Sequence, residues 1–555
     1  MSQATSANVA AHLPEMARLQ PETPAIFIPQ GINDQQQTRY EQYTFAELDQ
    51  ESGRMASALE SIGIRRGVRT VLMVPPGFEF FALTFALFKI GAVPVLVDPG
   101  MGVKNLKTCL AEAQPQAFIG VPKAHLARVL LGWGKPTVKM FLTVGKKFFW
   151  GGPTLDKILS RIPQGHDYQT AQTADDETAA ILFTSGSTGV PKGAVYSHGN
   201  FSAQVEMLRQ VYDIRPGEID LPTFPLFALF APALGMTSVV PEMDFTRPAD
   251  VDPVKIVAAI EKFQITTMFG SPALINRVGR YGEAQDIKLP SLKRAISAGA
   301  PVPAVVLERF ASMLSEPAQV FTPYGATEAL PVCSIGSTEI LSETRHATDQ
   351  GCGVCVGQAV PGINLEIIAI SDDPITAWDD NLKLGIDVIG ELVVKGPQVT
   401  QSYFNRTEST ALGKIADPEH SGFYHRMGDL GYRDEQGRIW FCGRKAHRVV
   451  TAKETLFTIP CEAIFNTHQA VFRTALVGAG EPGQARAVLC VELEKGADTS
   501  NLKKIHQELV AIGSENEVTR NIKTFLFHPE FPVDIRHNAK IFREKLAVWA
   551  KGQLS

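Results

Sequence analysis

Short apolar runs alternate with longer, helix-like stretches through the first 300 residues of the chain. Residues 70–76 (TVLMVPP) and 92–98 (AVPVLVD) have the composition of buried strands, and the apolar residues 78–90 between them fit a buried helix. Residues 116–121 and 139–144 are two further strand-like runs. Strands that alternate with helices in this way predict an α/β fold with a parallel sheet.

The pattern changes after about residue 352, where short apolar runs (INLEIIAI, GELVVKG) follow one another and indicate β structure. From Arg444 onward, strand-like runs are mixed with a helix that begins near Asn501. We therefore predict two domains, residues 1–444 and residues 445–555, with the boundary close to Arg444–His447.

Composition narrows the class of protein. A chain of 555 residues with 45% hydrophobic and 20% charged residues is globular and long enough for several domains. Its net charge of −5 argues against a nucleic-acid partner. Seven cysteines, an odd number, suggest no disulfide framework, so we expect a reducing, cytoplasmic environment. The most apolar stretch, 78–97, contains Glu79, Lys89 and Pro94, which favours a buried helix and strand over a membrane span.

A strand-like run leads directly into a loop of small hydroxyl and glycine residues, LFTSGSTGVPKG at 182–193. Small residues let backbone N–H groups approach phosphate oxygens closely, and a lysine adds positive charge. The spacing differs from the G-x-x-x-x-G-K-[ST] loop of P-loop nucleotidases. A surface Ser/Gly hairpin is the alternative interpretation. The predicted phosphate-binding residues are Thr184, Ser185, Gly186, Ser187, Thr188, Gly189 and Lys192.

Five motifs in order resemble those of the adenylate-forming enzymes, the family of acyl-CoA synthetases, luciferases and peptide-synthetase adenylation domains. They are TSGSTGVPKG, SAGAP (297–301), YGATE (324–328), GDL (428–430) followed by GRK (443–445), and NAK (538–540). The resemblance covers nearly the whole chain. It implies a large N-terminal domain of packed sheets and helices and a small, mobile α+β C-terminal domain, with ATP and Mg²⁺ as cofactors.

The resemblance also implies roles on the phosphate side of the site. The loop ending at Lys192 would hold the β- and γ-phosphates, and Thr327 would contact the α-phosphate. Glu328 would bind Mg²⁺ through its carboxylate oxygens. Lys540 would reach in from the C-terminal domain to the phosphate and carboxylate oxygens. Each of these residues taken alone would be interpreted as a turn, cap or surface residue.

Other positions would bind the adenosine. Asp429 would accept hydrogen bonds from the ribose hydroxyls, and Arg444 would help to fix the ribose. Tyr324, followed by Gly325 in the same motif, would stack on adenine. The base slot would be shaped by Gly299, Ala300 and Pro301.

Two apolar segments, 224–234 (FPLFALFAPAL) and 268–275 (MFGSPALI), are candidates for an acyl pocket suited to a long-chain acid. Ordinary core packing is the alternative for about half of these residues.

The chain departs from thioester-forming relatives after the Gly-Arg motif. Thr451–Thr455 stands where those enzymes have a Ser-Gly-Gly-like loop, and Lys453 and Glu454 would narrow the route of a thiol to the adenylate. An internal β-hydroxyl is then the natural nucleophile, because it is tethered beside the activated carbonyl.

Residues 442–466 and 322–332 resemble the β-lactone synthetase family of bacterial long-chain olefin biosynthesis. This resemblance implies ATP-dependent conversion of a 2-alkyl-3-hydroxy acid into a β-lactone, AMP and pyrophosphate. It also implies association with other olefin-pathway enzymes. His447 is a candidate to assist the hydroxyl, with a purely structural histidine as the alternative. Two other functions stay open: a long-chain fatty acyl-CoA or acyl-AMP ligase, and a non-catalytic nucleotide-binding subunit of an assembly.

Overall fold

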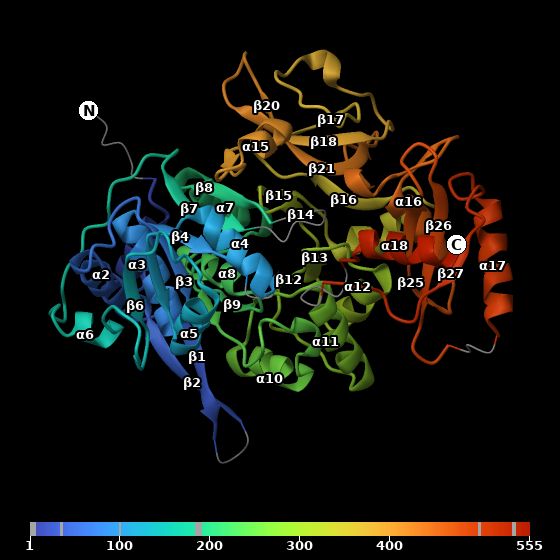
Figure 1. The fold of residues 1–555 in the computed structure, drawn as a ribbon. Coiled ribbons are helices and arrows are strands. Elements are labelled where there is room, and N and C mark those ends of the chain that lie inside the picture. Colours follow the sequence, from blue (N-terminus) through green and yellow to red (C-terminus); the bar gives the residue numbers. More distant parts are fainter. Residues whose placement is uncertain are drawn as a thin grey trace.

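The computed structural model describes residues 7–33, 37–98, 101–183, 191–497, 501–534 and 540–554. Three large sheets form the N-terminal part, and a small three-stranded sheet lies in the C-terminal part (Figure 1). The fold is mixed α/β, as the strand and helix alternation predicts. Among the described helices, none is both long and apolar enough to cross a lipid bilayer.

The first sheet carries the phosphate-loop region. Its strand order is β19-β8-β7-β4-β3-β5-β6, parallel except where β8 pairs with β7 and β19. The strands are β3 (Arg69–Met73), β4 (Val93–Leu96), β5 (Ala117–Gly120), β6 (Met140–Thr143), β7 (Thr178–Phe183), β8 (Gly193–Ser197) and β19 (Ser402–Tyr403). The helices between them are α3 (Phe78–Ile90), α4 (Val103–Ala113), α5 (Pro122–Leu131), α6 (Leu155–Leu159) and, after β8, α7 (His198–Tyr212).

Helix α3 is the apolar stretch that length alone could confuse with a membrane span. Eleven of its thirteen residues are buried, and it packs against α2 (Phe45–Ser61). Lys89 is only 2% exposed, and its Nζ donates a hydrogen bond of 2.6 Å to Asp49 Oδ1. The helix ends at Gly91, which has a left-handed backbone. The prediction of a buried helix followed by a strand is confirmed.

The second sheet is also mostly parallel, with the order β13-β12-β11-β9-β10-β1-β2. Only the β1–β2 hairpin is antiparallel. Its strands are β1 (Pro24–Ile32), β2 (Thr38–Thr44), β9 (Ile219–Pro222), β10 (Thr237–Val239), β11 (Thr267–Phe269), β12 (Arg294–Ile296) and β13 (Gln319–Phe321). The helices α10 (Pro253–Phe263), α11 (Pro272–Ala284) and α12 (Ala304–Ala311) connect and cover it.

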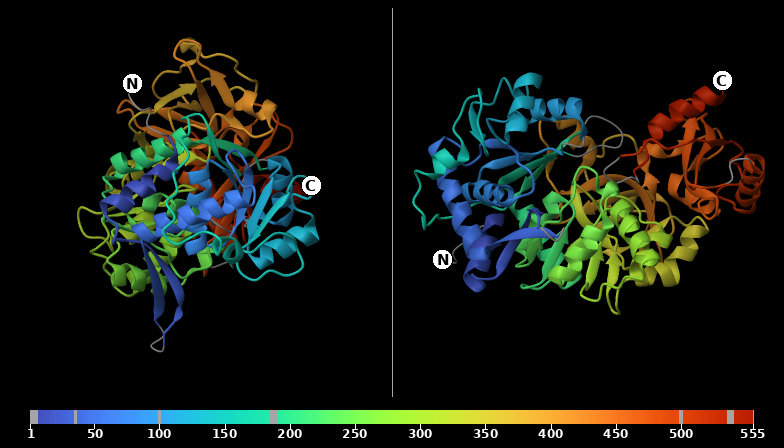
Figure 2. Two further views of the ribbon diagram at one scale, coloured as in Figure 1. Left: turned by 90° about the vertical axis from the view of Figure 1, so that its left-hand side faces the viewer. Right: turned by 90° about the horizontal axis from the view of Figure 1, so that it is seen from below.

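The third sheet is antiparallel and accounts for the change of pattern after residue 352. The order is β14-β15-β16-β22-β21-β18-β17, with β20 paired to β21. Its strands are β14 (Tyr324–Ala326), β15 (Ala329–Ser334), β16 (Val354–Ala359), β17 (Asn364–Ile368), β18 (Gly390–Lys395), β20 (Lys414–Ala416), β21 (Phe423–Arg433) and β22 (Ile439–Arg444). In the left view of Figure 2, the orange strands of this sheet lie above the large parallel sheets.

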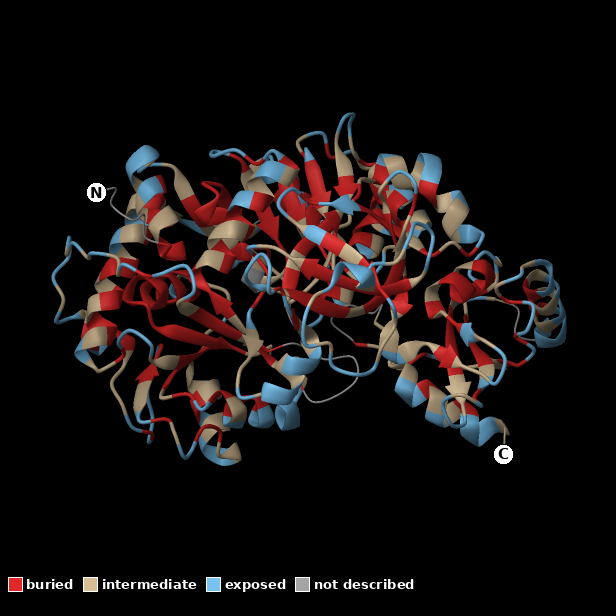
Figure 3. Ribbon diagram, turned by 90° about the horizontal axis from the view of Figure 1, so that it is seen from above, coloured by how far each residue is buried: buried red, intermediate tan, exposed pale blue. Residues whose placement is uncertain are grey.

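The C-terminal part begins with a short 3-10 turn, Lys445–His447, directly after β22. It contains β23 (Val449–Val450), β24 (Thr455–Leu456), β25 (Val471–Ala479), β26 (Arg486–Leu493) and β27 (Phe525–Phe527), with α16 (Thr458–Phe465), α17 (Leu502–Glu515) and α18 (Arg543–Leu554). Both apolar clusters of this part consist of residues from Val449 onward. Figure 3 shows their buried residues set apart from those of the larger body. Whether the two parts move independently about residue 444 stays a prediction.

Candidate active site

The described residues include only part of the predicted phosphate loop. Thr184, Ser185, Gly186, Ser187, Thr188 and Gly189 lie outside the described residues, so their role stays a prediction. Lys192 is described and directly precedes β8. Its Nζ lies 5.0 Å from the centroid of the Tyr403 ring, within the range of a cation–π contact.

Tyr403 links Lys192 to the predicted metal-binding carboxylate. Strand β19 pairs with β8, with Tyr403 opposite Ala194, and so places residue 403 close to Lys192. The Tyr403 hydroxyl donates a hydrogen bond of 2.7 Å to Glu328 Oε1. Burial, and then the charge of Glu328, raise the pKa of Tyr403, so its hydroxyl keeps its proton as a donor. No sequence motif marked Tyr403, because its position depends on strand pairing across 200 residues.

The turn that carries Thr327 and Glu328 lies between β14 and β15. Tyr196 donates its hydroxyl to the Thr327 carbonyl, and the Thr400 amide donates 2.9 Å to the Glu328 carbonyl. A Cβ on Gly325 would lie 2.5 Å from the Ala329 carbonyl oxygen, so only glycine fits there. Two hydrogen bonds and one close backbone contact therefore fix the conformation of this motif.

His425 is buried and Lys414 is half-buried close to this turn, and sequence reasoning missed both. Burial lowers the pKa of Lys414 to about 7, against the opposing effect of Glu328. Its Nζ donates to the Thr400 carbonyl. Burial, followed by the charge of Lys414, holds the pKa of His425 well below its usual value, and its Nδ1 lies 2.9 Å from the Gly413 carbonyl. Neither Lys414 nor His425 is part of a recognisable sequence motif, so only the fold shows that they lie near the site.

The predicted ribose residues meet on neighbouring strands. Asp429 on β21 lies opposite Arg444 on β22, with 3.0 Å between Oδ1 and Nη1. Tyr324 donates its hydroxyl to Asp429 Oδ2 at 2.7 Å. Burial raises the pKa of Asp429, and Arg444 opposes that effect. Apart from this ion pair with Arg444, Asp429 Oδ1 is buried and accepts no hydrogen bond from the described residues, which leaves it able to accept one from a ligand hydroxyl.

The predicted base slot lies after β12. Gly299 and Pro301 are exposed, Ala300 is half-buried, and Gly299 has a φ of +100°. Tyr324 has its hydroxyl on Asp429 and its ring 6.0 Å from that of Phe441. Stacking of Tyr324 on adenine stays a prediction.

His447 and Lys540 come together although 93 positions separate them in the chain. Burial, and then the charges of Arg543, Arg444 and Lys540, lower the pKa of His447 to about 3. Its Nε2 is buried and has no hydrogen-bond partner among the described residues. The imidazole is therefore neutral at pH 7 and has a vacant nitrogen within a cluster of cations.

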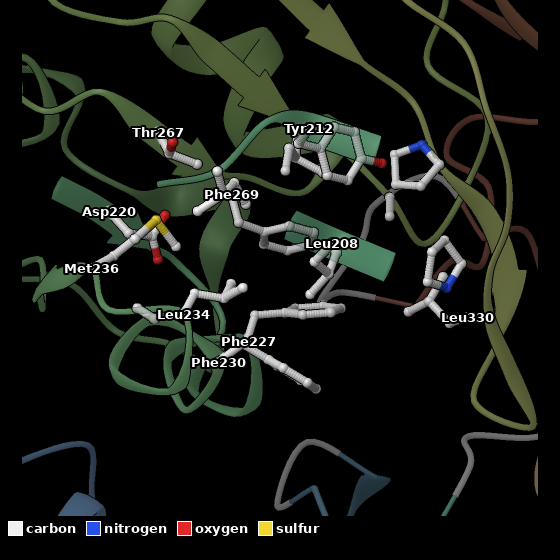
Figure 4. A pocket seen from close by; sticks show the side chains of 16 residues that line it. Leu208, Tyr212, Asp220, Phe227, Phe230, Leu234, Met236, Thr267, Phe269 and Leu330 are labelled. Carbon is white, nitrogen blue, oxygen red and sulfur yellow. The ribbon is translucent and has the colours of Figure 1, made fainter. Parts of the chain in front are cut away.

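An apolar cavity of about 70 Å³ lies among α7, the short helices α8 (Pro225–Ala228) and α9 (Phe230–Ala233), and the ends of the second sheet (Figure 4). The segments predicted as an acyl pocket contribute Phe227, Phe230, Ala231, Leu234 and Phe269. Ala298 and Pro323, next to the predicted adenine loop and to Tyr324, line the same cavity. The cavity therefore reaches the predicted adenylate site.

One acidic side chain faces this apolar cavity. Asp220 on β9 is 6% exposed and lies opposite Thr267 in the sheet register. Burial raises its pKa to about 8, although Arg294 opposes the shift. Figure 4 shows Asp220 beside Met236, at the far end of the cavity from Leu330. Sequence reasoning missed it, because IDLP reads as an ordinary short strand.

The fold and this arrangement of carboxylates, tyrosines and lysines define an AMP-binding enzyme. The chain belongs to the AMP-binding enzyme family, whose sequence model matches residues 13–404. It is 52% identical to an olefin beta-lactone synthetase of Xanthomonas campestris pv. campestris, over 99% of this chain and 98% of that one. An olefin beta-lactone synthetase of Stenotrophomonas maltophilia is 49% identical over 99% of this chain and 98% of its own.

The fold also matches that of a solved adenylate complex. The structure of the anthranilate CoA ligase AuaEII in complex with anthranoyl-AMP superposes with a TM-score of 0.79 and 18% identity. The match covers 100% of this chain and 99% of that one. The predicted adenylate-forming fold and family are confirmed.

Proposed function

We propose that the protein uses ATP to activate a long-chain 2-alkyl-3-hydroxy acid as its acyl-AMP and then closes the acid's own 3-hydroxyl onto the activated carbonyl. The products are a β-lactone, AMP and pyrophosphate. The observation that carries this proposal is the 52% identity to an olefin beta-lactone synthetase over 99% of the chain. The apolar cavity beside Ala298 and Pro323 supports an acid with an alkyl chain.

In the first step, a carboxylate oxygen of the acid attacks the α-phosphorus of ATP, and pyrophosphate leaves. Such a transfer depends mainly on positioning and on neutralising the phosphate charge. Lys192 and Lys540 supply positive charge, and Asp429 with Arg444 positions the ribose. The Glu328 carboxylate, with one oxygen oriented by Tyr403, fits Mg²⁺, which usually takes one or two protein carboxylates and substrate phosphates. When bound, the ion would neutralise phosphate charge.

In the second step, the 3-hydroxyl oxygen attacks the acyl carbonyl carbon, AMP leaves, and the hydroxyl proton must be accepted. His447 suits this role because its imidazole is neutral and its Nε2 is vacant beside Lys540 and Arg444. An anionic adenylate in this cationic cluster would offset the three positive charges and raise the basicity of the imidazole. The tethered hydroxyl also has a high effective molarity, which offsets the strain of the four-membered ring.

The segment that replaces the glycine-lined thiol route is a closed hairpin. Strands β23 and β24 pair, and the Thr451 amide donates to the Glu454 carbonyl at 2.9 Å. Asn521 Nδ2 donates 2.7 Å to Glu454 Oε1, which holds that side chain in place. This arrangement favours lactone formation over transfer to the thiol of coenzyme A.

A product assay tests the proposal. Purified protein is mixed with Mg·ATP and a racemic long-chain 2-alkyl-3-hydroxy acid, with and without coenzyme A, and AMP, lactone and thioester are followed. We expect lactone and AMP in equal amounts without coenzyme A. Formation of a thioester, and only when coenzyme A is present, would show that the protein is an acyl-CoA ligase. AMP without either product would indicate an acyl-AMP ligase.

Lys540→Ala and its matched control Lys545→Ala test the role of the C-terminal lysine. Lys545 is an exposed residue of α18. We expect the Lys540 variant to lose adenylation at least about 100-fold, since it removes a charge that acts on the reacting phosphate, and the Lys545 variant to keep it. Equal adenylation by both variants would show that Lys540 has another role.

We also propose that the protein works beside other enzymes of olefin biosynthesis. Co-elution of tagged protein with a condensing enzyme, reductase or lactone decarboxylase would test this.

A further inference from the structure

The edge of the first sheet carries a strong local positive charge. Between Glu112 and Asp156 the chain has five lysines, one arginine and no acidic residue, although the net charge of the whole protein is −5. All five lysines are exposed, whereas Arg128 is half-buried over the Phe141 ring. This segment forms β5, α5, β6 and the loop after β6, and β6 is the last strand of the sheet. The charge is therefore concentrated on one edge of the molecule.

Exposed apolar side chains lie among these lysines. Phe148 and Phe149 are 63% and 73% exposed, and they are two of the three exposed phenylalanines among the described residues. On α5, Leu130 is 73% exposed, and Leu126 and Val129 are each 42% exposed. We call the exposed side chains of α5 and of residues 145–149 the basic-apolar face. Side chains of this size are normally exposed singly, so five in one region indicate a binding surface.

The fold holds the two phenylalanines outward. Trp150, the next residue, is buried, stacks on His125 of α5 at 5.3 Å, and donates its Nε1 to Thr143 Oγ1 at 2.9 Å. The loop returns to β6 where the Thr143 amide donates 3.1 Å to the Pro153 carbonyl. Gly152 makes this turn with a φ of +85°, and a Cβ there would lie 2.2 Å from the Phe141 carbonyl oxygen. Phe148 and Phe149 are therefore exposed because they belong to an ordered loop, which Trp150 and Gly152 fix against α5 and the edge of the sheet.

We propose that the basic-apolar face binds the surface of an anionic lipid bilayer. The lysines pair with headgroup phosphates, and Phe148, Phe149 and Leu130 enter the boundary between headgroups and acyl chains. A bilayer offers a negative layer directly above an apolar one, which matches lysines adjacent to apolar side chains. A polynucleotide could stack on the phenylalanines but would leave the aliphatic side chains of α5 uncovered.

The place of this face is compatible with movement of the C-terminal part. Figure 1 shows α5 and β6 in the half of the molecule that lies away from α17. A bilayer docked there would leave the segment around His447 and Lys540 unhindered. The acids of the proposed function carry long alkyl chains and partition into bilayers, so the docked enzyme would be close to its substrate; only this last consequence rests on the proposed function.

Vesicle co-sedimentation tests the proposal without substrate. The protein is mixed with vesicles of phosphatidylcholine alone or of phosphatidylcholine with phosphatidylglycerol. We expect binding only to the anionic vesicles, weakened by salt because exposed charges are screened. Each lysine near an anionic surface contributes about fivefold in affinity, so Lys146→Glu with Lys147→Glu should weaken binding at least about 25-fold. Phe148→Ser with Phe149→Ser should also weaken binding at least about tenfold.

Matched controls come from the C-terminal part of the molecule. Lys503→Glu with Lys504→Glu reverses two exposed lysines of α17, and Val548→Ser removes a side chain on α18 that is 75% exposed. We expect both control variants to bind like the unaltered protein. Equal binding to neutral and anionic vesicles, no binding to either, or equal losses in control and test variants would overturn the proposal. Adenylation of a water-soluble short acid, measured in parallel, should be unchanged in the face variants, which separates this test from that of the proposed function.

Discussion

Asp220→Asn should make the protein more stable, by an amount that grows with pH. Asp220 faces the apolar cavity, is 6% exposed, and accepts no hydrogen bond from the described residues. Arg294, whose charge opposes the rise in pKa, is already paired with Glu218 and donates to Thr267 Oγ1. Burial therefore raises the pKa of the carboxyl from 3.8 to about 8, and the folded protein keeps it protonated at neutral pH.

The sign and size of the effect follow from proton linkage. Between pH 4 and pH 8 the unfolded chain has lost the Asp220 proton and the folded protein keeps it, so the free energy of unfolding falls as pH rises. The slope is about 1.36 kcal/mol per pH unit. From pH 5 to pH 7, two units, the unaltered protein should lose about 2.7 kcal/mol through this residue. Asparagine has the same shape as aspartate and does not titrate, so the free energy of unfolding of the variant should not fall with pH through this residue.

The assay is equilibrium unfolding in urea at pH 5, 6, 7, 8 and 9, followed by tryptophan fluorescence. The stability difference between Asp220→Asn and the unaltered protein should rise with pH in favour of the variant up to about pH 8 and then level off. Asp213→Asn, at the exposed end of α7, is the control for replacing an aspartate by asparagine. A stability difference for Asp220→Asn that stays constant with pH would refute a neutral carboxyl in the cavity.

Three further predictions concern catalysis. Tyr403→Phe removes the hydrogen bond to Glu328, and we expect kcat/KM for Mg·ATP to fall about tenfold or more, the usual cost of a bond to a charged group, in a pyrophosphate-exchange assay; unchanged kinetics would show that Glu328 needs no such support. Gly325→Ala should abolish adenylation and lower the unfolding temperature, because its Cβ would lie 2.5 Å from the Ala329 carbonyl oxygen; a fully active variant would contradict this packing. His447→Ala should slow lactone release at least about tenfold while pyrophosphate exchange keeps its rate; equal losses in both assays would make the histidine structural.

Local patterns predicted those parts of the fold that depend on neighbours in the chain. The buried helix α3, the parallel strands around it and the antiparallel region after residue 352 all follow from runs of adjacent residues. Asp429 and Arg444 could be paired in advance because both belong to known motifs, and the β21–β22 register places them together. Their distance from each other in the chain is short enough for a hairpin.

Contacts made by distant strands could not be predicted in this way. Tyr403 reaches Glu328 only because β19 pairs with β8, and Lys414 approaches the same turn through β20 at the side of the third sheet. Asp220 has no motif, and its raised pKa depends on a cavity assembled from several helices and strands. These residues acquire their chemistry from tertiary packing, which the order of residues along the chain does not display.

The two carboxylates proposed to act on ATP, Glu328 and Asp429, each accept a hydrogen bond from a tyrosine hydroxyl. Tyr403 donates to Oε1 of Glu328 at 2.7 Å, and Tyr324 donates to Oδ2 of Asp429 at 2.7 Å. In each pair the tyrosine hydroxyl occupies one oxygen and fixes the plane of the carboxylate, and in Asp429 the second oxygen lies 3.0 Å from Arg444 Nη1. Because burial raises the pKa of both tyrosines, each hydroxyl keeps its proton at neutral pH and acts as a donor. Burial raises the pKa of Asp429, and the charge of Arg444 and then the hydrogen bond from Tyr324 oppose that rise, so the hydroxyl that orients this carboxylate also compensates part of its desolvation.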